Sequence, residues 1–234
     1  LMDWKQDALL HAKDQDPKES VGVLLNIKGK QQYYPCGNLS TYSHQCFILD
    51  PKDYVKADNL GEITAIIHSH PVTPPTPTQA DKVSCEDSGL PWHIVNPKTE
   101  QWGYYEPTGY KAPLLGREWV WGVTDCWSLV RDWYKENLDI DLRDWERPLT
   151  PEEFLKNPMF EQCAWRTGFR QLRPEEKLQK GDLLFMSIMS PGLNHVALFL
   201  GDEILHHLAD RLSCREPLSE WLLKCIGGRY RYAA

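Results

Sequence analysis

Two histidines separated by one residue end an apolar run in the first half of the chain. They are His68 and His70, and Asp81 follows them across a segment rich in proline and threonine. Alternate residues of a strand point to the same face, so the two imidazoles can aim at one point. Two histidines and one carboxylate give zinc three protein ligands and leave a fourth position for water, as in catalytic zinc sites. The pattern therefore predicts a zinc site.

Hydrolysis at such a site also needs a group that takes a proton from water. Zinc lowers the pKa of a bound water toward ~7, and a nearby carboxylate can act as the general base. Glu19 is the candidate, because it stands just before the apolar run 21–27. The alternative reading is a pair of surface histidines at a strand end. Thr78 and Asp81 at their spacing argue against that alternative.

The residues Glu19, His68-Ser-His-Pro71, Thr78 and Asp81 together resemble the motif of the JAMM/MPN metallopeptidases. The resemblance covers about residues 1–106, and it implies an α/β JAMM-like (MPN) domain over residues 1–110. It also implies that zinc is bound by His68, His70 and Asp81, with Glu19 as the acid/base. Thr78 takes the place of the family's serine, whose hydroxyl helps to hold the oxyanion. The family cleaves peptide or isopeptide bonds.

A cysteine begins a predicted helix in the second half of the chain. Cys126 opens the helical pattern 126–138 directly after Asp125. The dipole and free N–H groups of a helix start favour a thiolate, so we expect a reactive thiol of lowered pKa. The alternative is an inert buried cysteine, since cysteine is among the most buried residue types. Asp125 is more typical of a helix N-cap than of a catalytic group.

A thiol nucleophile needs a base, and the base needs a polar group to orient it. His195 opens the apolar run 194–201 and is the candidate base. His206 or His207, in the following run 203–208, can supply the orienting group.

These residues occur in an order that resembles the NlpC/P60 cysteine peptidases. The resemblance covers about residues 114–234 and implies an α+β papain-like domain over residues 111–234, with Cys126 and His195 as catalytic residues. The third residue of the triad depends on whether the match to the family contains a gap. Matching Ile204-Leu205-His206 to the family's pattern places this residue at His206, whereas counting from His195 without a gap places it at His207. We favour His206, because a shift of one residue along a strand faces the opposite side. The matched positions are Asp125-Cys126, Gly181-Asp182-Leu183, His195-Val196-Ala197 and Gly201-Asp202.

The order of the two domains resembles the tail-tip assembly proteins of lambda-like phages. This implies a hydrolase of the phage tail tip, combining a zinc metallopeptidase with a thiol protease. Its substrate would be peptidoglycan stem peptides during cell-wall penetration, or a tail protein during tail assembly. Other tail-tip proteins would be its partners, in the host cytoplasm during assembly and then in the virion. The alternatives are a non-enzymatic assembly factor or plug that retains the peptidase folds, and a bacterial cell-wall remodelling hydrolase.

Hydrophobic periodicity outlines the elements that must position these groups. The segment 107–118 carries two prolines and two glycines and is the expected domain boundary. We expect helices at 4–13, 126–138 and 151–157, and strands at 21–27, 45–49, 62–70, 92–97, 101–106, 181–188, 194–201 and 203–208.

Composition narrows the functional classes. A chain of 234 residues suits two small domains, and 41% hydrophobic residues can form real cores. The net charge of −7 and the lack of a basic tract argue against nucleic acid as a partner. No apolar run reaches the roughly 20 residues of a membrane span, and the first residues lack the features of a secretory signal. The seven scattered cysteines do not suggest a disulfide framework.

Overall fold

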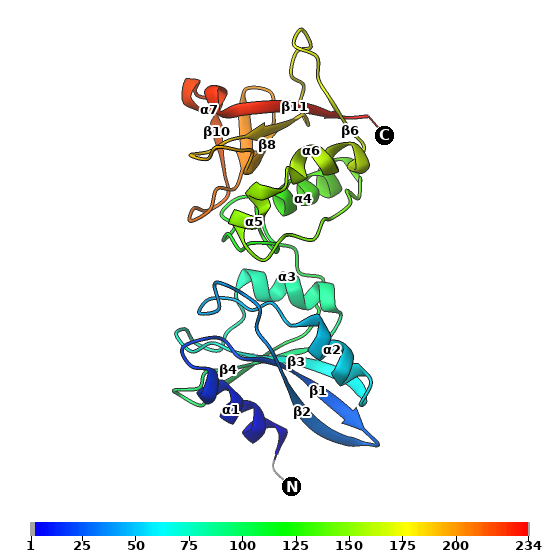
Figure 1. Cartoon of the computed structure of the whole chain (residues 1–234), viewed down its shortest axis with the longest axis vertical. Coiled ribbons are helices and arrows are strands. Elements are labelled where there is room, and N and C mark those ends of the chain that lie inside the picture. The colour runs from blue at the N-terminus through cyan, green and yellow to red at the C-terminus, as the bar shows by residue number, and fades with distance from the viewer. Residues whose placement is uncertain (1–2, 234) are drawn as a thin grey trace. The chain divides into compact units, whose positions relative to one another are not determined.

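The computed structural model describes residues 3–233 and divides the chain into two compact units (Figure 1). The first unit ends at Lys111 and the second begins at Ala112. Each unit has its own sheet and its own hydrophobic core. Each candidate site can therefore be described within one unit.

The first unit is built on a five-stranded sheet in the order β2-β1-β3-β4-β5. Strands β3 and β4 run parallel, and every other neighbouring pair is antiparallel. The strands are β1 (Val21–Ile27), β2 (Lys30–Cys36), β3 (Glu62–Ser69), β4 (Trp92–Val95) and β5 (Trp102–Tyr105), and the helices are α1 (Trp4–Gln15), α2 (Pro51–Asp58) and α3 (Gln79–Ser88).

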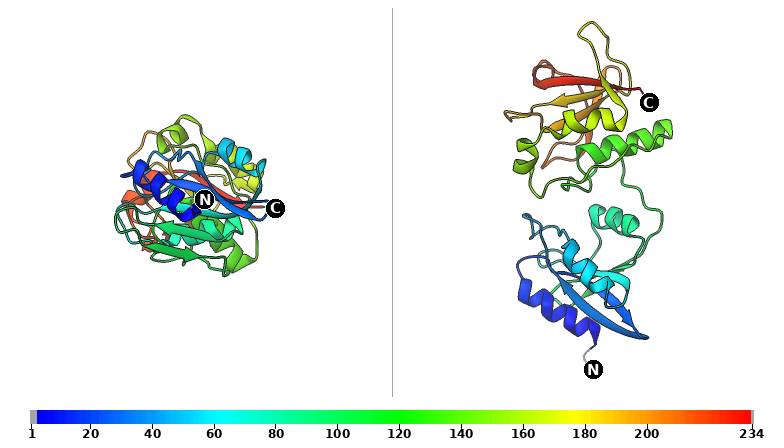
Figure 2. Two further views of the ribbon diagram at one scale, coloured as in Figure 1. Left: turned by 90° about the horizontal axis from the view of Figure 1, so that it is seen from below. Right: turned by 45° about the vertical axis from the view of Figure 1, so that its right-hand side comes forward.

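Helices cover both faces of this sheet (Figures 1 and 2). Ala8 of α1 packs with Leu24 on one face, whereas Ala57 of α2 and Cys85 of α3 pack with Val23 on the other. Successive residues of a strand point to opposite faces, so β1 is apolar at consecutive positions because both of its faces are covered. The expected α/β architecture of the first half is confirmed.

One expected strand of the first unit is wrong. Residues 45–49 form a loop whose only strand-like contact is an isolated bridge between Asn38 and Leu49. The Asn38 side chain donates to the Cys46 carbonyl at 3.3 Å and accepts from the Ile48 N–H at 3.0 Å. A side chain thus takes the hydrogen bonds that a neighbouring strand would have made. The sequence analysis also missed β2, α2 and α3.

The second unit contains a six-stranded antiparallel sheet in the order β10-β9-β8-β7-β11-β6. Its strands are β6 (Phe169–Gln171), β7 (Leu183–Met186), β8 (His195–Phe199), β9 (Glu203–His206), β10 (Cys214–Pro217) and β11 (Ile226–Tyr232). Its helices are α4 (Cys126–Leu138), α5 (Pro151–Lys156), α6 (Met159–Ala164) and α7 (Glu220–Cys225), with a 3₁₀ turn, η1, at Trp165–Thr167.

Helices α4, α5 and α6 lie on the same side of this sheet (Figure 2). Leu129 of α4 belongs to a core with Phe185 of β7, whereas Leu184 of β7 faces Leu222 of α7 on the opposite side. The alternation along β7 follows from the two-residue period of a strand. A helix that precedes a small antiparallel sheet was expected here, and it is confirmed. Among residues 3–233, no helix is long and apolar enough to cross a bilayer.

Two candidate catalytic sites

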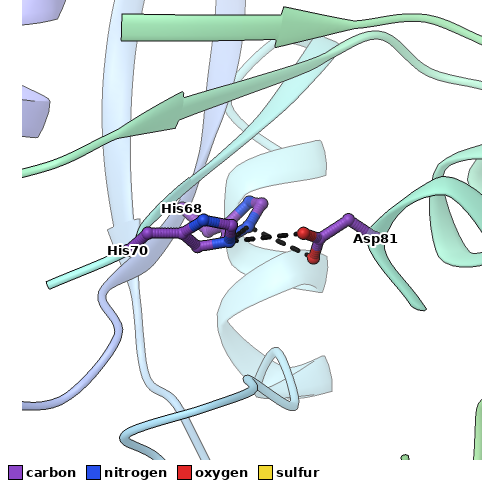
Figure 3. A group of neighbouring side chains, drawn as sticks. All are labelled: His68, His70 and Asp81. Atoms are coloured by element: carbon purple, nitrogen blue, oxygen red, sulfur yellow. Dashed lines mark hydrogen bonds and ion pairs between the residues drawn. The ribbon is translucent and has the colours of Figure 1, made fainter. Parts of the chain in front are cut away.

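The first candidate site lies where β3 ends. His68 sits on this central strand, opposite Val21 of β1 and Ile94 of β4. His70 follows the strand, and its backbone N–H still donates to the Val95 carbonyl at 2.9 Å. Both imidazoles are buried, and they project to the same side of the chain (Figure 3). The side chains of His68 and His70 therefore share one side of the chain, as the alternation of side chains along a strand predicted.

The loop between His70 and α3 is held against the sheet. The Asn96 side chain donates to the Thr73 carbonyl at 2.9 Å. A Cβ at Gly103 of β5 would lie 1.7 Å from the Pro75 carbonyl oxygen, so only glycine permits this approach. Helix α3 therefore begins close to the histidines, and its first turn presents Asp81 to them.

The structure brings His68, His70 and Asp81 together (Figure 3). The two Nε2 atoms are 3.0 Å apart, and each lies 3.3 Å from one Asp81 oxygen. His70 Nδ1 donates to the Pro74 carbonyl at 2.9 Å, which leaves the His70 Nε2 lone pair for a metal. Two imidazole nitrogens and a carboxylate, all within 4.8 Å of one another, fit zinc.

The electrostatics of this cluster favour a charged carboxylate. Burial by itself would raise the pKa of Asp81, but the charges and hydrogen bonds of His68 and His70 together outweigh it and hold that pKa well below its usual range. Burial lowers the pKa of His68. Burial also opposes the charged form of His70, yet the contacts with Asp81 raise the His70 pKa overall. A carboxylate and a neutral His68 are the ligand forms that a metal requires.

Glu19 and Thr78 complete the expected set. Glu19 is 5% exposed, and burial raises its pKa to about 8, against the influence of the nearby His70 charge. Thr78 is the N-cap of α3: its hydroxyl accepts from the Asp81 N–H at 3.1 Å, and an Asp81 oxygen accepts from the Thr78 N–H at 2.7 Å. This capping box fixes the backbone that carries the Asp81 carboxylate.

The second candidate site lies at the start of α4. Cys126 is the first residue of the helix, and the Asp125 side chain accepts from the Ser128 N–H at 3.0 Å. The prediction that Asp125 caps this helix is confirmed. Asp125 is also buried in a two-pronged ion pair with Arg147, at 2.9 and 3.0 Å. Sequence reasoning missed Arg147, because nothing local links it to Asp125.

The expectation of a lowered thiol pKa is wrong for this structure. Burial, followed by the Asp125 charge, raises the pKa of Cys126 to about 12. The backbone N–H groups of Val196 and Trp127 point at the sulfur and favour the thiolate, but they do not outweigh burial. Burial therefore favours the neutral thiol of Cys126 over the thiolate. Its contact with the Val196 N–H also places the start of β8 beside the start of α4.

A row of polar side chains leads from the start of β8 to β10. His195 Nε2 lies 3.1 Å from His206 Nδ1, and His206 Nε2 lies 2.6 Å from Glu216 Oε1. Both rings are buried. Burial, reinforced by the charges of His206 and His207, lowers the pKa of His195 far below its usual value, and burial also lowers that of His206. Both imidazoles are therefore neutral at pH 7.

The structure places His206, and not His207, against His195. His207 Nε2 donates to the Arg211 carbonyl at 3.0 Å, and burial lowers the His207 pKa to about 4. His207 comes after the last residue of β9, and its ring has a different hydrogen-bond partner from that of His206. Glu216 was not predicted from the sequence. The available signal was that Cys214 and Glu216 stand two residues apart, as polar residues on one face of a strand do, and the structure shows that this strand pairs with β9. These two side chains and His206 also have their ligand atoms within 4.8 Å of one another.

An apolar pocket lies beside Cys126. It extends from the start of α4 toward α5 and α6, and the Asp125–Arg147 pair forms its polar wall. The aromatic and sulfur-containing side chains that line it include Trp121, Trp145, Phe154, Met159 and Phe160. Such a surface can hold an aliphatic group next to the thiol.

Two families match the two units of the chain. The family described as prokaryotic homologs of the JAB domain matches residues 3–105, and the NlpC/P60 family matches residues 116–226. The expected order of an α/β MPN-type domain and an α+β NlpC/P60 domain is thereby confirmed.

Two curated relatives match most of the chain. Tail tip assembly protein K of Escherichia phage N15 is 35% identical over 219 residues, which cover 90% of this chain and 87% of the relative. The protein of the same name from Escherichia phage lambda is 34% identical over 175 residues, covering 74% and 83% of the two chains.

Two solved structures each match the chain over less than half of its length. A solution structure of a Desulfitobacterium hafniense protein is 23% identical, with a TM-score of 0.36, and covers 45% of this chain and 87% of that one. A crystal structure of a JAB1/MPN domain protein from Archaeoglobus fulgidus is 19% identical, with a TM-score of 0.29, and covers 44% and 83%.

Proposed function

Because the chain belongs to the family of tail tip assembly protein K of phages N15 and lambda, as its domain order predicted, we propose that it is a tail-tip peptidase that uses the Cys126 thiol. The observation that carries this proposal is the contact between His195 and His206 beside the start of α4, where the N–H of Val196, the residue after His195, points at the Cys126 sulfur. Its partners would be other proteins of the phage tail. The alternative of a bacterial cell-wall remodelling enzyme has no support in these relatives.

The proposed reaction starts from a neutral pair. The Cys126 sulfur attacks a peptide carbonyl while its proton passes to Nδ1 of His195, and the imidazolium then gives that proton to the leaving amine. Water hydrolyses the resulting thioester with His195 again as the base. Because burial disfavours both the thiolate and the imidazolium, proton transfer has to accompany the attack rather than precede it. His206 holds the ring of His195 in the orientation that this transfer requires.

We propose peptidoglycan stem peptides as the substrate, for opening the cell wall during infection. NlpC/P60 membership and the tail-tip relatives support this choice. The apolar pocket beside Cys126 suits the aliphatic part of a stem-peptide residue better than a free carboxylate. The alternative substrate is a tail protein that is cut during assembly, and its cleavage would proceed by the same chemistry of the Cys126 thiol.

We further propose that His68, His70 and Asp81 hold zinc in the first unit. A metal held there would supply a polarised, readily deprotonated water. Glu19, whose carboxyl group is buried beside His70 and would be ionised by the charge of a bound metal, would then accept a proton from water and deliver it to the leaving amine. Thr78 would donate its hydroxyl hydrogen, which the helix cap does not use, to the oxyanion. Support comes from the donor set and from the match to prokaryotic JAB homologs.

The test of the proposed function is digestion of purified peptidoglycan by the whole chain, with mass spectrometry of the released peptides. The wild type and His68→Ala should release stem-peptide fragments, and Cys126→Ala should release none. His207→Ala is a matched control, because His207 Nε2 is bonded to the Arg211 carbonyl and not to His195. Fragments that persist in Cys126→Ala would contradict the thiol mechanism.

A non-enzymatic assembly role is the second candidate, and the buried thiol with its raised pKa favours it. In that case phage carrying Cys126→Ala would assemble tails and infect normally, and the wild-type protein would release no peptides. Phage that assemble normally but infect poorly would instead support the peptidase at the tail tip.

A further inference from the structure

We propose that Glu216 is a positioning residue that sets the tautomers of His206 and His195, so that Nδ1 of His195 becomes the proton acceptor for Cys126. The inference rests on the thiol chemistry of the proposed function. It concerns a residue outside the expected Cys126, His195 and His206 set. It is carried by two short contacts between three side chains.

The first step is the contact between His206 and Glu216. An ionised carboxylate can only accept hydrogen bonds. Since Glu216 Oε1 lies 2.6 Å from His206 Nε2, this nitrogen has to carry the hydrogen. The reverse arrangement would place a lone pair against a carboxylate at that distance, which is repulsive. His206 is therefore protonated at Nε2.

The second step follows from the neutrality of the ring. A neutral imidazole carries one hydrogen, so Nδ1 of His206 is left as an acceptor. Its partner at 3.1 Å is Nε2 of His195, which must then be the donor. His195 in turn has its lone pair on Nδ1. In the opposite chain of tautomers, Nδ1 of His195 would carry a hydrogen and could not accept one from the thiol.

The surroundings of Glu216 fit this role. Strand β10 pairs with β9, so the Glu216 carboxylate lies on the strand next to His206, with its side chain 32% exposed. Arg211 Nη1 lies 4.0 Å from Oε1 and supports the charged carboxylate. Cys214 is the other titratable group beside it, and burial together with the Glu216 charge raises the Cys214 pKa, so that thiol is neutral. The carboxylate is thus the charged acceptor of this cluster, at the solvent side of two buried rings.

A direct test is the tautomer of each ring, measured by long-range ¹H–¹⁵N correlation on the full chain labelled with ¹⁵N-histidine. At pH 7 the wild type should show His195 and His206 both protonated at Nε2 and bare at Nδ1. Glu216→Leu should lose this single state, with His206 and His195 each shifted toward protonation at Nδ1. The matched control is Glu203→Leu, because Glu203 begins β9, the strand of His206, but pairs with Arg215 at 3.6 Å.

The outcomes separate the inference from the proposed function. A wild-type His195 protonated at Nδ1, or tautomers unchanged in Glu216→Leu, would overturn the inference. If Glu216→Leu does not fold, Glu216→Gln keeps the size of the side chain, and its amide should produce a mixture of both tautomer chains. Expected tautomers in a protein that cuts no peptide would refute the proposed function alone. Where peptides are cut, Glu216→Leu should lower kcat about 10-fold or more with KM unchanged, within the roughly 10²–10⁴-fold contribution of a general base.

Discussion

Replacing Arg147 by methionine should strongly destabilise the second unit. Arg147 and Asp125 form a buried ion pair, with side chains 7% and 2% exposed and two hydrogen bonds of 2.9 and 3.0 Å. Methionine keeps much of the apolar stem but removes the charge that faces Asp125. The carboxylate would then be buried beside the thiol of Cys126 without a compensating cation.

Removing one partner of such a buried pair costs about 3–5 kcal/mol, because the remaining charge is left uncompensated. The sign of the pH effect follows from Asp125. Burial would raise its pKa, but Arg147 and the Ser128 and Gly122 N–H groups hold that pKa below its usual value. The stabilisation is therefore present above the unfolded-state pKa of ~3.9 and is lost as pH falls through the lowered folded-state pKa.

Hydrogen exchange of the α4 amides measures the opening of the second unit alone. At pH 7, Arg147→Met should lower the protection of these amides by an amount corresponding to about 3–5 kcal/mol. Arg170→Met is the matched control, since it removes an exposed partner of Glu176 and should leave α4 protection close to wild type. Near pH 4 the loss should be smaller, because the unpaired Asp125 becomes protonated. A loss that is absent at pH 7, or that grows on acidification, would refute this reasoning.

Three further results are expected. Purified protein should carry about one zinc per chain by elemental analysis; His70→Ala should lose it, whereas Glu19→Gln should keep it and lose only hydrolysis by the first unit. Gly103→Ala should push the Pro75 loop away and weaken zinc binding, measured by competition with a chelator, without altering α4 protection. In a short iodoacetamide pulse at pH 6, Cys126 should label no faster than the half-buried cysteines, because its pKa is raised; fast labelling would show an activated thiolate instead.

The cluster of His68, His70 and Asp81 could be predicted from the sequence because its geometry is local. His68 lies on β3 and His70 comes directly after its end, and the short loop that follows returns to Asp81. The same segment also held an unused signal for α3: a threonine followed three residues later by an acidic residue marks a capping box. The incorrect prediction of a strand at 45–49 has a non-local cause. The side chain of Asn38 makes the hydrogen bonds that hold this segment as a loop, and no pattern within the segment shows this.

The thiol site was only partly predictable because its chemistry depends on contacts between distant segments. The residue types and the strand periods indicated Cys126, His195 and either His206 or His207, and the resemblance to the NlpC/P60 peptidases favoured His206. The raised thiol pKa follows from burial, which no local pattern shows. The partners Arg147 and Glu216 come from a loop and from a strand that the sequence analysis did not assign.

The two sites use the start of a helix in opposite electrostatic ways. In the first unit, Asp81 in the first turn of α3 faces two imidazoles and remains ionised, which suits metal binding. In the second unit, the capping carboxylate of Asp125 adjoins the nucleophile itself and, together with burial, opposes the thiolate that the helix terminus would favour. The helix therefore cannot supply the activation of Cys126. In the proposed mechanism that task is left to His195, whose tautomer is set through His206 by Glu216, and it is completed only when the sulfur attacks a substrate carbonyl.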